Sequence, residues 1–300
     1  MTETVSVIIA TRNRAPILTM CLEALGQQQT NGFTCEVIVV DDCSVDATEA
    51  VVRKFASTHR KPTELIRQPR PLGANAARNR GIQMARGEAV VLLDDDALAP
   101  DNWLQELVTG LSQSGCPVVS GPVKLRFDGH IPWKHQAEVG SLLAEVLVAP
   151  RGFRGEVVPL AGNMAALRSV FGRAKFDETL RPPMEETDWL WRAGVEAAFV
   201  PEAWVWHYKT RDDLRTYRML RGAWNRGGEG GWWMREKLQM PLANRRREAF
   251  RGIRTCARAA GHAAVHMCWG GAVVAASELS KASALLGLTN RGKRSPGSWR

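Results

Sequence analysis

The most informative chemical feature of the chain is a run of three aspartates, Asp94–Asp96, which directly follows a Val- and Leu-rich stretch. Such a stretch is typical of a buried strand, so the three carboxylates lie at the mouth of a sheet and not inside it. Side chains alternate along a strand, so Asp94 and Asp96 point the same way and Asp95 points oppositely. Two carboxylates on one side suit a hard divalent cation that also grips a phosphate. The pattern favours a metal-assisted reaction on a diphosphate; alternatively, these aspartates cap the helix that starts near Pro100–Asp101.

Strand-like and helix-like segments alternate through the first 125 residues, which predicts an α/β fold with a mostly parallel sheet and helices on both faces. Short β-branched runs predict strands at Val5–Ala10, Cys35–Asp41, Glu64–Gln68, Ala89–Leu93 and Pro117–Val123. Helical periodicity predicts helices at Ala15–Gln28, Ala47–His59, Gly73–Ala85 and Asp101–Gly110. Ligands bind outside the carboxyl ends of the strands in such sheets. Polar residues follow three of the strands at those ends, namely Thr11–Arg12, Asp41–Asp42 and Asp94–Asp96.

The pattern is less regular beyond residue 125. The stretch from Phe127 to Pro159 is rich in turns and predicts no clear element. The next segment, VPLAGNMAALRSVF, predicts a strand, a turn of small residues and a helix from about Ala165. A loop and a short helix are expected in DETLRPPMEETDWLWRAG, and a strand pair in AAFVPEAWVWHYKTR.

The positive charge of the chain is concentrated in its last third. Residues 1–208 hold 21 Lys and Arg against 25 Asp and Glu, a net charge of −4, whereas residues 209–300 hold 19 against 6, a net charge of +13. A helical pattern from Arg211 to Trp224 is expected to break at Gly227–Gly231, and the apolar stretch Ala263–Ala276 is shorter than the roughly 20 residues of a membrane span. We expect residues 211–300 to form a basic, mainly helical region that lies on an anionic membrane surface. Alternatively, this region is a helical lid that packs on the main domain.

Composition places the chain among soluble proteins, with 45% hydrophobic and 24% charged residues. Six cysteines show neither CxxC pairs nor zinc-type spacing, which indicates a reduced, cytoplasmic setting. The N-terminal residues lack a basic leader and are predicted to form the first strand.

The order of motifs along the chain resembles family-2 glycosyltransferases with the GT-A fold. The motifs are VSVIIATRNR, EVIVVDDCSVDAT, GANAARNRGIQMARGEAVVLLDDDALAP, AGNMAALR, EETDWLWR and VWHYKTR, between about residues 4 and 211. The resemblance implies a GT-A domain at residues 1–210 that transfers a sugar from a nucleotide diphosphate-sugar with inversion, assisted by Mg²⁺ or Mn²⁺. UDP-sugars are favoured as donors, with dTDP- and GDP-sugars as alternatives. A glycan or lipid-linked acceptor in cell-envelope or polysaccharide biosynthesis is expected, at the inner face of the cell membrane.

The resemblance also implies roles for individual residues. Asp96 contacts the ion, His207 adds an imidazole ligand, and Asp94 contacts the ion, its bound water or the ribose. The nucleotide-sugar is expected to bind Thr11, Arg12, Asp41, Asp42, Gly73, Asn75, Arg78, Asp94 and Asp95. The acceptor is expected near Gly162, Asn163 and Trp189; because residues two apart do not share a helix face, at most one of Trp189 and Trp191 lines that site.

An inverting reaction needs a general base, and the resemblance places it at Glu186 in the string Glu185-Glu186-Thr187-Asp188. Relatives usually have Asp at this position. The extra methylene of Glu moves the carboxylate by about one bond length, so Glu185 or Asp188 is an alternative base.

Two other functions are alternatives to sugar transfer. A nucleotidyltransferase of similar fold normally has a glycine-rich basic loop after the first strand, which TRNRAPIL is not. A non-catalytic protein that binds a nucleotide-sugar or another anion gives Glu186 and His207 no role, and no nucleic-acid-reading motif is recognisable, so we expect no nucleic-acid partner.

Overall fold

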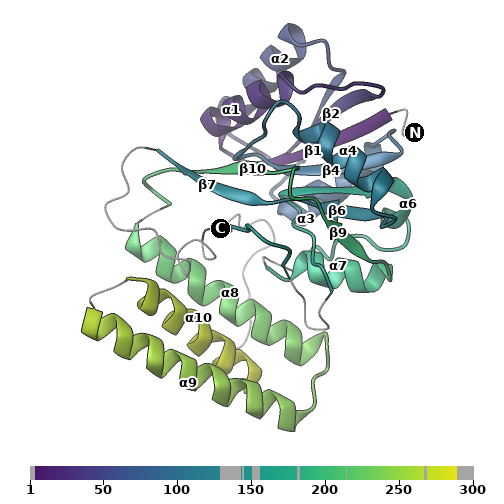
Figure 1. The fold of residues 1–300 in the computed structure, drawn as a ribbon. Coiled ribbons are helices and arrows are strands. Elements are labelled where there is room, and N and C mark those ends of the chain that lie inside the picture. Colours follow the sequence, from purple (N-terminus) through teal and green to yellow (C-terminus); the bar gives the residue numbers. More distant parts are fainter. Residues whose placement is uncertain are drawn as a thin grey trace.

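A computed structural model of the chain describes residues 4–128, 143, 145–150, 156–180, 183–213, 215–266 and 269–288. Much of the 127–159 stretch therefore lies outside the described residues. Strands and helices form an α/β layer, and a layer of three helices lies beneath it (Figure 1).

The main sheet has seven strands in the order β3-β2-β1-β4-β8-β6-β9. Their bounds are β1 (Thr4–Thr11), β2 (Thr34–Asp41), β3 (Thr63–Arg67), β4 (Ala89–Asp94), β6 (Val118–Ser120), β8 (Asn163–Leu167) and β9 (Ala197–Phe199). The first four strands are parallel, and β8 runs antiparallel to β4 and β6. Thr11 pairs with Asp41 and Ala10 with Asp94, so the carboxyl ends of β1, β2 and β4 lie side by side.

A second sheet brings a distant part of the chain to this edge. Its order is β5 (Ala97–Leu98), β10 (Val205–Lys209) and β7 (Val123–Phe127). His207 pairs with Ala97, the residue that directly follows the aspartate run. The small sheet therefore carries β10 to the tip of β4.

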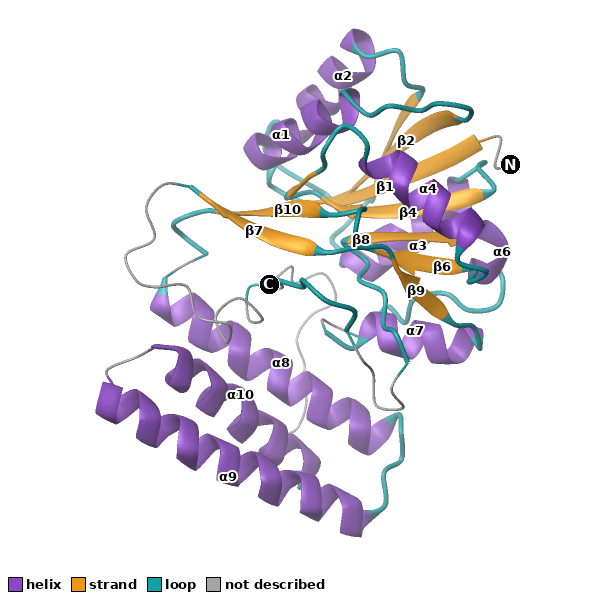
Figure 2. Cartoon of the chain, in the orientation of Figure 1, coloured by secondary structure: helices purple, strands orange, loops and turns teal. Residues whose placement is uncertain are grey.

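Helices cover both faces of the main sheet (Figure 2). One core contains Val7 and Ile9 with α1 (Ala15–Gly26), α2 (Thr48–Thr58) and α4 (Trp103–Gln113). The other contains Ile8 and Ala10 with α3 (Ala74–Met84), α6 (Arg168–Phe171) and α7 (Glu185–Ala193). Neighbouring residues of β1 enter opposite cores because strand side chains alternate. The predicted α/β sheet with helices on both faces is confirmed.

The helix predicted from Ala165 is wrong, because Asn163–Leu167 forms β8. β4 and β6 pair with both edges of this segment, and its two faces are buried in the two cores, Met164 and Ala166 in one and Ala165 in the other. This burial outweighs the helix propensity of alanine. The helix begins only at Arg168.

Two other strand predictions need correction. Pro117–Val123 is not one strand: it contains β6 and the start of β7, which belong to different sheets. The two strands expected in AAFVPEAWVWHYKTR are present as β9 and β10, but they do not pair with each other, because β9 lies in the main sheet and β10 in the small one.

Three long helices, α8 (Thr216–Glu236), α9 (Leu242–His266) and α10 (Trp269–Leu285), form the C-terminal unit. The helix break expected at Gly227–Gly231 is wrong, since α8 is continuous. A Cβ atom would lie 1.9 Å from the Ser277 carbonyl oxygen at Gly227, and 2.4 Å from that of Lys281 at Gly231. The glycines let α10 approach the α8 backbone, and this packing compensates for their low helix propensity.

The C-terminal unit packs on the α/β layer through α7. Trp233 of α8 is fully buried, meets Trp191 edge-on at 5.1 Å and donates a hydrogen bond of 3.2 Å to Asp188. A boundary near residue 210 thus separates segments that share a core, and the division into two domains stays a prediction. Among the described residues, no helix is both long and apolar enough to cross a bilayer.

Candidate active site

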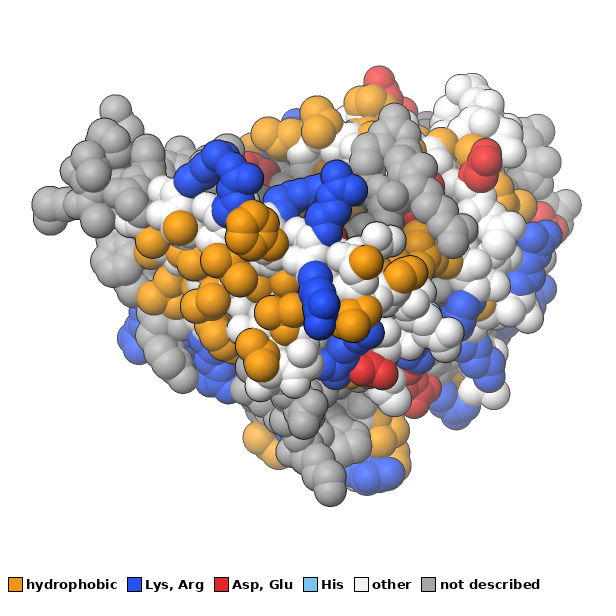
Figure 3. Space-filling view, turned by 90° about the horizontal axis from the view of Figure 1, so that it is seen from below, with side chains coloured by type: hydrophobic (Ala, Val, Ile, Leu, Met, Phe, Trp, Pro, Cys, Tyr) orange, Lys and Arg blue, Asp and Glu red, His pale blue; other side chains and the backbone are white. Residues whose placement is uncertain are grey.

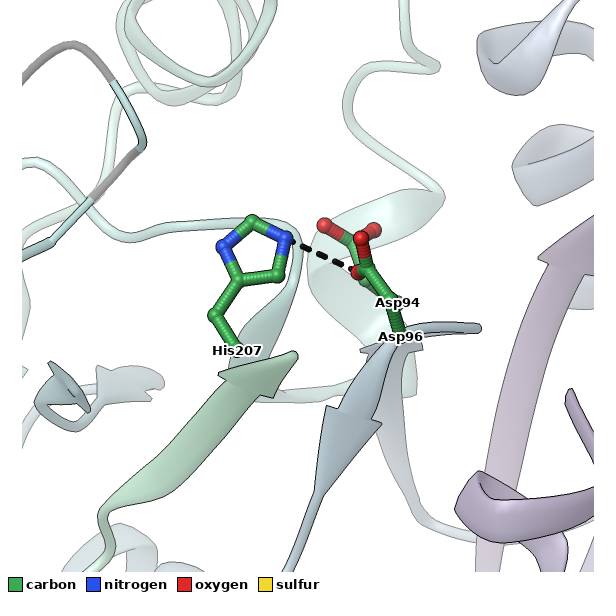
Figure 4. Close-up of side chains that lie close together, drawn as sticks. All are labelled: Asp94, Asp96 and His207. Carbon is green, nitrogen blue, oxygen red and sulfur yellow. Dashed lines mark ion pairs between the residues drawn. The ribbon is translucent and has the colours of Figure 1, made fainter. Parts of the chain in front are cut away.

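Asp94, Asp96 and His207 come together at the carboxyl edge of the sheet. Each can offer one ligand atom, and these atoms all lie within 4.8 Å of one another. Figure 4 shows the two carboxylates side by side, with the imidazole turned toward them. Asp95 and Asp96 lie in the turn that follows β4, so the strand alternation predicted for the aspartate run ends at Asp94.

Lys209 joins this group. Side chains of β10 alternate between buried and half-buried, so His207 and Lys209 lie on the same face. His207 Nε2 is 2.9 Å from Asp96 Oδ1 and 2.6 Å from Lys209 Nζ. Lys209 Nζ is also 3.4 Å from Asp96 Oδ2, and all three side chains are buried.

Arg14 spans the other side of the aspartate run. Its guanidinium donates hydrogen bonds of 2.7 Å to Asp95 Oδ1 and 2.8 Å to Asp96 Oδ2. Thr11 Oγ1 donates a hydrogen bond of 2.8 Å to Asp95 Oδ2. Arg14 and Thr11 therefore fix Asp95, while Asp96 faces both Arg14 and β10.

The charges set the protonation states of this group. Burial alone would raise the pKa of Asp96, but His207, Lys209 and Arg14 together hold that pKa well below its ordinary value. Burial lowers the pKa of His207, and Asp96 offsets this only in part. His207 is therefore neutral at pH 7, and the cations Lys209 and Arg14 keep Asp96 ionised there.

The donor set fits a divalent ion. His207 Nε2 faces a carboxylate, which needs a proton donor, and an ammonium, which needs an acceptor. One neutral tautomer cannot satisfy both. His207 Nε2 and Asp96 Oδ1 lie 2.9 Å apart, and carboxylate oxygens with an imidazole nitrogen are groups that Mg²⁺ or Mn²⁺ would accept as ligands. Asp96, His207 and Asp94 are the residues that would hold Mg²⁺ or Mn²⁺.

A second acidic group lies at the start of α7 and is joined to the first by Arg78. Arg78 is 3.1 Å from Asp94 Oδ1 and 3.7 Å from Glu185 Oε1. Glu186 Oε1 accepts a hydrogen bond of 3.0 Å from the Ala161 amide. Burial raises the pKa of Glu185 well above its ordinary value, with the Glu186 carboxylate as the next cause. Burial likewise raises the pKa of Glu186, against the opposing charge of Arg78.

Asp188, the third acid of this string, has structural contacts. It accepts a hydrogen bond of 2.6 Å from Arg192 and one of 3.2 Å from Trp233. These contacts tie α7 to α8, which sets Asp188 apart from Glu185 and Glu186.

The predicted donor residues at the end of β2 are buried and shape the neighbouring loops. Asp41 Oδ1 accepts a hydrogen bond of 2.8 Å from the Ser44 amide. Asp42 accepts bonds of 2.7 and 3.0 Å from the Leu72 and Gly73 amides. Gly73 has φ of 101°, a conformation that favours glycine, and directly precedes α3. Asp42 thus positions the loop that contains Gly73.

The remaining predicted donor residues have different surroundings. Arg12 is half-buried just beyond β1. Asn75 is buried and donates hydrogen bonds to the carbonyls of Asp177 and Leu180, so it anchors α3 to the segment before α7. Asn75 Oδ1 also accepts a bond of 3.1 Å from Arg78.

Of the predicted acceptor residues, only Gly162 adjoins the aspartates: a Cβ there would lie 2.5 Å from Asp94 Oδ2. Asn163 is fully buried, and its side chain bonds Trp103 and two backbone carbonyls. Trp189 is also fully buried, stacked on Phe171 at 5.0 Å. Their side chains build the core and are not exposed to an acceptor.

Sequence reasoning missed Arg14 and Lys209 as parts of the site. The signal for Lys209 was its position two residues after His207 on a strand, which puts both on one face. Arg14 gave no comparable signal, because its contact with Asp95 and Asp96 depends on how the loop after β1 turns over the tip of β4.

Comparison with known proteins agrees with this architecture. A family model described as Glycosyl transferase family 2 matches residues 6–173, more than half of the chain. Glycosyltransferase AglE of Haloferax volcanii is 34% identical over 123 residues, which cover 41% of this chain and 40% of AglE. The succinoglycan biosynthesis protein ExoO of Rhizobium meliloti is 36% identical over 38% of this chain and 31% of its own. The putative glycosyltransferase EpsH of Bacillus subtilis is 34% identical over 62% of this chain and 54% of its own. The matches thus span between 31% and 54% of these relatives.

Solved structures share the fold at lower identity. The mannosyltransferase PcManGT of Pyrobaculum calidifontis, in complex with GDP-Man and Mn²⁺, has a TM-score of 0.60 at 19% identity and covers 98% of this chain and 76% of its own. S. aureus TarS 1-349, in complex with UDP-GlcNAc, has a TM-score of 0.53 at 17% identity and covers 76% of this chain and 66% of its own. The family match over residues 6–173 and the acidic tip of β4 lead to one conclusion: the chain belongs to glycosyl transferase family 2.

Proposed function

We propose that the protein is an inverting, metal-dependent glycosyltransferase that moves a sugar from a nucleotide diphosphate-sugar to a glycan or lipid-linked acceptor. The observation that carries the proposal is the joining of two acidic groups by Arg78, which contacts Asp94 on one side and Glu185 on the other. The group of Asp94, Asp96 and His207 has the chemistry to bind a diphosphate together with a divalent ion. The group of Glu185 and Glu186 has the chemistry of a general base.

Glu186 is the base that we favour. Its raised pKa makes the carboxylate a stronger proton acceptor than an ordinary glutamate. The Ala161 amide holds one carboxylate oxygen at 3.0 Å, which fixes the orientation of the other. Glu186 would take the proton of the acceptor hydroxyl. The oxygen of this hydroxyl would attack the anomeric carbon from the face opposite the diphosphate, which leaves. Glu185 and Asp188 remain the alternatives.

The opposite end of the site would stabilise the leaving nucleoside diphosphate. A bound Mg²⁺ or Mn²⁺ supplies Lewis-acid neutralisation of its developing charge. Asp96 and His207 would hold that ion with Asp94, while Arg14 keeps Asp95 and Asp96 in place. Asp41, at the end of β2, would contact the base of the nucleotide.

The wider role that we propose is in cell-envelope or polysaccharide biosynthesis, at the inner face of the cell membrane. The name of one relative, the succinoglycan biosynthesis protein ExoO, supports the polysaccharide part of this assignment. UDP-sugars are our first choice of donor, with GDP- and dTDP-sugars as alternatives.

A thermal-shift panel of UDP, GDP and dTDP, each with and without Mn²⁺, tests the donor proposal. We expect one nucleotide to raise the melting temperature of the protein only when Mn²⁺ is present, because the ion and the diphosphate share one site. A ligand present at about 100 times its Kd stabilises the folded state by about 2.7 kcal/mol, which is several degrees for a chain of this size.

AMP serves as the control for this panel, since it offers the base and ribose of a nucleotide without a diphosphate. A protein that no nucleoside diphosphate stabilises, with or without Mn²⁺, would contradict the proposed function. Stabilisation of equal size by AMP would contradict the role of the diphosphate.

The outer face of α9 supports contact with a membrane surface. Phe250 and Ile253 are 63% and 44% exposed there. Five exposed arginines share the helix with them: Arg246, Arg247, Arg251, Arg254 and Arg258. Seen from below, Figure 3 shows hydrophobic side chains interspersed with Lys and Arg on this side of the molecule. Exposed apolar groups beside arginines suit the boundary between the headgroups and acyl chains of an anionic bilayer.

We expect the protein to sediment with vesicles that contain phosphatidylglycerol and not with vesicles of phosphatidylcholine alone. The double variant Arg247→Ala/Arg254→Ala should bind them roughly 30-fold more weakly, since each basic residue near an anionic surface contributes about 1 kcal/mol. Phe250→Ser should weaken binding without changing its salt dependence.

Arg53→Ala is the matched control, because Arg53 is an exposed arginine on α2, in the other layer of the molecule. It should bind vesicles like the wild type. If the wild type stays in solution with anionic vesicles, or binds neutral ones equally well, the membrane contact is wrong.

A further inference from the structure

The three aspartates at the tip of β4 already face three cations of the chain. The contacts are 3.1 Å from Arg78 to Asp94, 2.7 and 2.8 Å from Arg14 to Asp95 and Asp96, and 3.4 Å from Lys209 Nζ to Asp96. Each carboxylate of the aspartate run therefore already faces at least one cation of the chain. An added divalent ion must displace or tolerate these cations.

Lys209 is the cation that competes directly with an ion for its ligands. Its Nζ lies 2.6 Å from His207 Nε2 and 3.4 Å from Asp96 Oδ2. An imidazole nitrogen has a single lone pair, which cannot accept a proton from an ammonium and bind an ion at the same time. Lys209 must leave this position before His207 can become a ligand. Arg14 and Arg78 contact only carboxylates of this cluster, whose two oxygens offer further lone pairs.

We propose that Lys209 is a positioning residue that stands in for the divalent ion until the donor arrives and then turns to the donor's diphosphate. The inference rests on the proposed function, since it assumes a diphosphate donor. Lysine suits this movement because its charge sits on a flexible four-carbon stem. Lys209 is 4% exposed, so its ammonium needs a new anionic partner within the site when it leaves Asp96 and His207.

The charges make ion and donor depend on each other. An ion alone adds two positive charges to a cluster whose carboxylates already face cations, and it displaces Lys209 from Asp96 and His207. A nucleoside diphosphate brings at least two negative charges. These charges offset the two positive charges of the ion and offer Lys209 an anionic partner. Each ligand should therefore strengthen the binding of the other by the same factor, as linkage requires.

The experiment is a titration of the full-length protein with MnCl₂, alone and with UDP or GDP, followed by the electron paramagnetic resonance signal of free Mn²⁺. Binding of Mn²⁺ to the nucleotide in solution is measured separately and subtracted. We expect the nucleotide that the protein accepts to tighten Mn²⁺ binding at least ~10-fold in the wild type. Lys209→Met should bind Mn²⁺ alone ~10-fold or more tightly than the wild type, because removing a unit charge a few ångströms away removes a large repulsion. In this variant the nucleotide should tighten Mn²⁺ binding less.

Lys124→Met is the matched control. Lys124 lies on β7 opposite Trp206, so it belongs to the same small sheet but to the face away from His207. It should leave Mn²⁺ affinity unchanged. Lys209→Arg, which keeps the positive charge, should also bind Mn²⁺ alone no better than the wild type. Lys209→Gln provides a second neutral variant in case methionine prevents folding.

The outcomes separate this inference from the proposed function. Unchanged or weaker binding of Mn²⁺ alone by both folded neutral variants overturns the role of Lys209, even if the wild type binds Mn²⁺ and nucleotide together. A wild-type protein that binds neither Mn²⁺ nor UDP or GDP, alone or combined, overturns the proposed function itself.

Discussion

Replacing Glu186 with Gln is expected to lower the rate of sugar transfer by roughly 10²- to 10⁴-fold, the range typical of a lost general base. The amide cannot take the proton of an acceptor hydroxyl. Its oxygen can still accept the hydrogen bond of 3.0 Å from the Ala161 amide, so the variant should keep its fold. Donor binding should be unchanged within about twofold, because Glu186 acts on the acceptor. Two quantities are measured: the rate of sugar transfer to the acceptor, and, by calorimetry, the affinity of the protein for the nucleotide in the presence of Mn²⁺.

The raised pKa of Glu186 predicts the direction of the pH dependence. The base acts in its ionised form, so activity is present above this pKa and is lost as the pH falls through it. The acid limb of kcat/KM should therefore lie above pH 4.3, the value of an ordinary glutamate. Because Glu185 and Glu186 lie together in a buried site, the measured pKa belongs to the pair.

Glu185→Gln and Asp188→Asn are the variants that distinguish the alternatives. Asp188→Asn should act mainly on stability, since Asp188 bonds Arg192 and Trp233. A fully active Glu186→Gln enzyme together with an inactive Glu185→Gln enzyme would move the base to Glu185. An inactive variant that has also lost nucleotide binding would show damage to the whole site and not the loss of a base.

The tips of the strands could be predicted because their signal is local. The apolar run of β4 ends at the aspartates, and the carboxyl ends of parallel neighbours must meet at one edge. The same reasoning brought Asp41 to this edge. His207 was different: it reaches the aspartates through the pairing of β10 with β5, which no sequence pattern predicted, and only the resemblance to a family indicated its role.

The failures share a physical cause, which is competition between local preference and distant packing. Ala165 sits in a sequence with good helix propensity, yet two neighbouring strands bury it on both sides. Gly227 and Gly231 weaken an isolated helix, yet they are required where α10 meets α8. None of these contacts can be inferred from the residues that lie nearby in the sequence.

Asp96→Asn is expected to remove the effect of Mn²⁺ on nucleotide affinity and to reduce transfer by roughly three orders of magnitude, since Lewis-acid stabilisation of a leaving group is worth several kcal/mol. Asp96 is the one side chain of the aspartate run that contacts both Arg14 and His207. The amide preserves its shape and still accepts a hydrogen bond from Arg14, but it is a poorer ligand for a hard cation than a carboxylate. Calorimetry of UDP and GDP with and without Mn²⁺ measures the effect directly.

Stability must be measured beside affinity, because Asp96→Asn leaves Arg14 and Lys209 with one negative charge fewer in a buried place. A lower melting temperature is therefore expected in the absence of ligands and does not by itself concern the ion. Asp101→Asn, an exposed aspartate beyond the same strand end, controls for the loss of a carboxylate near the site. If Asp96→Asn is folded and Mn²⁺ still strengthens its nucleotide binding as in the wild type, Asp96 is not the ligand. Other groups would then hold the ion with the nucleotide, and the aspartate run would serve to hold Arg14, Arg78 and Lys209 for direct contact with the diphosphate.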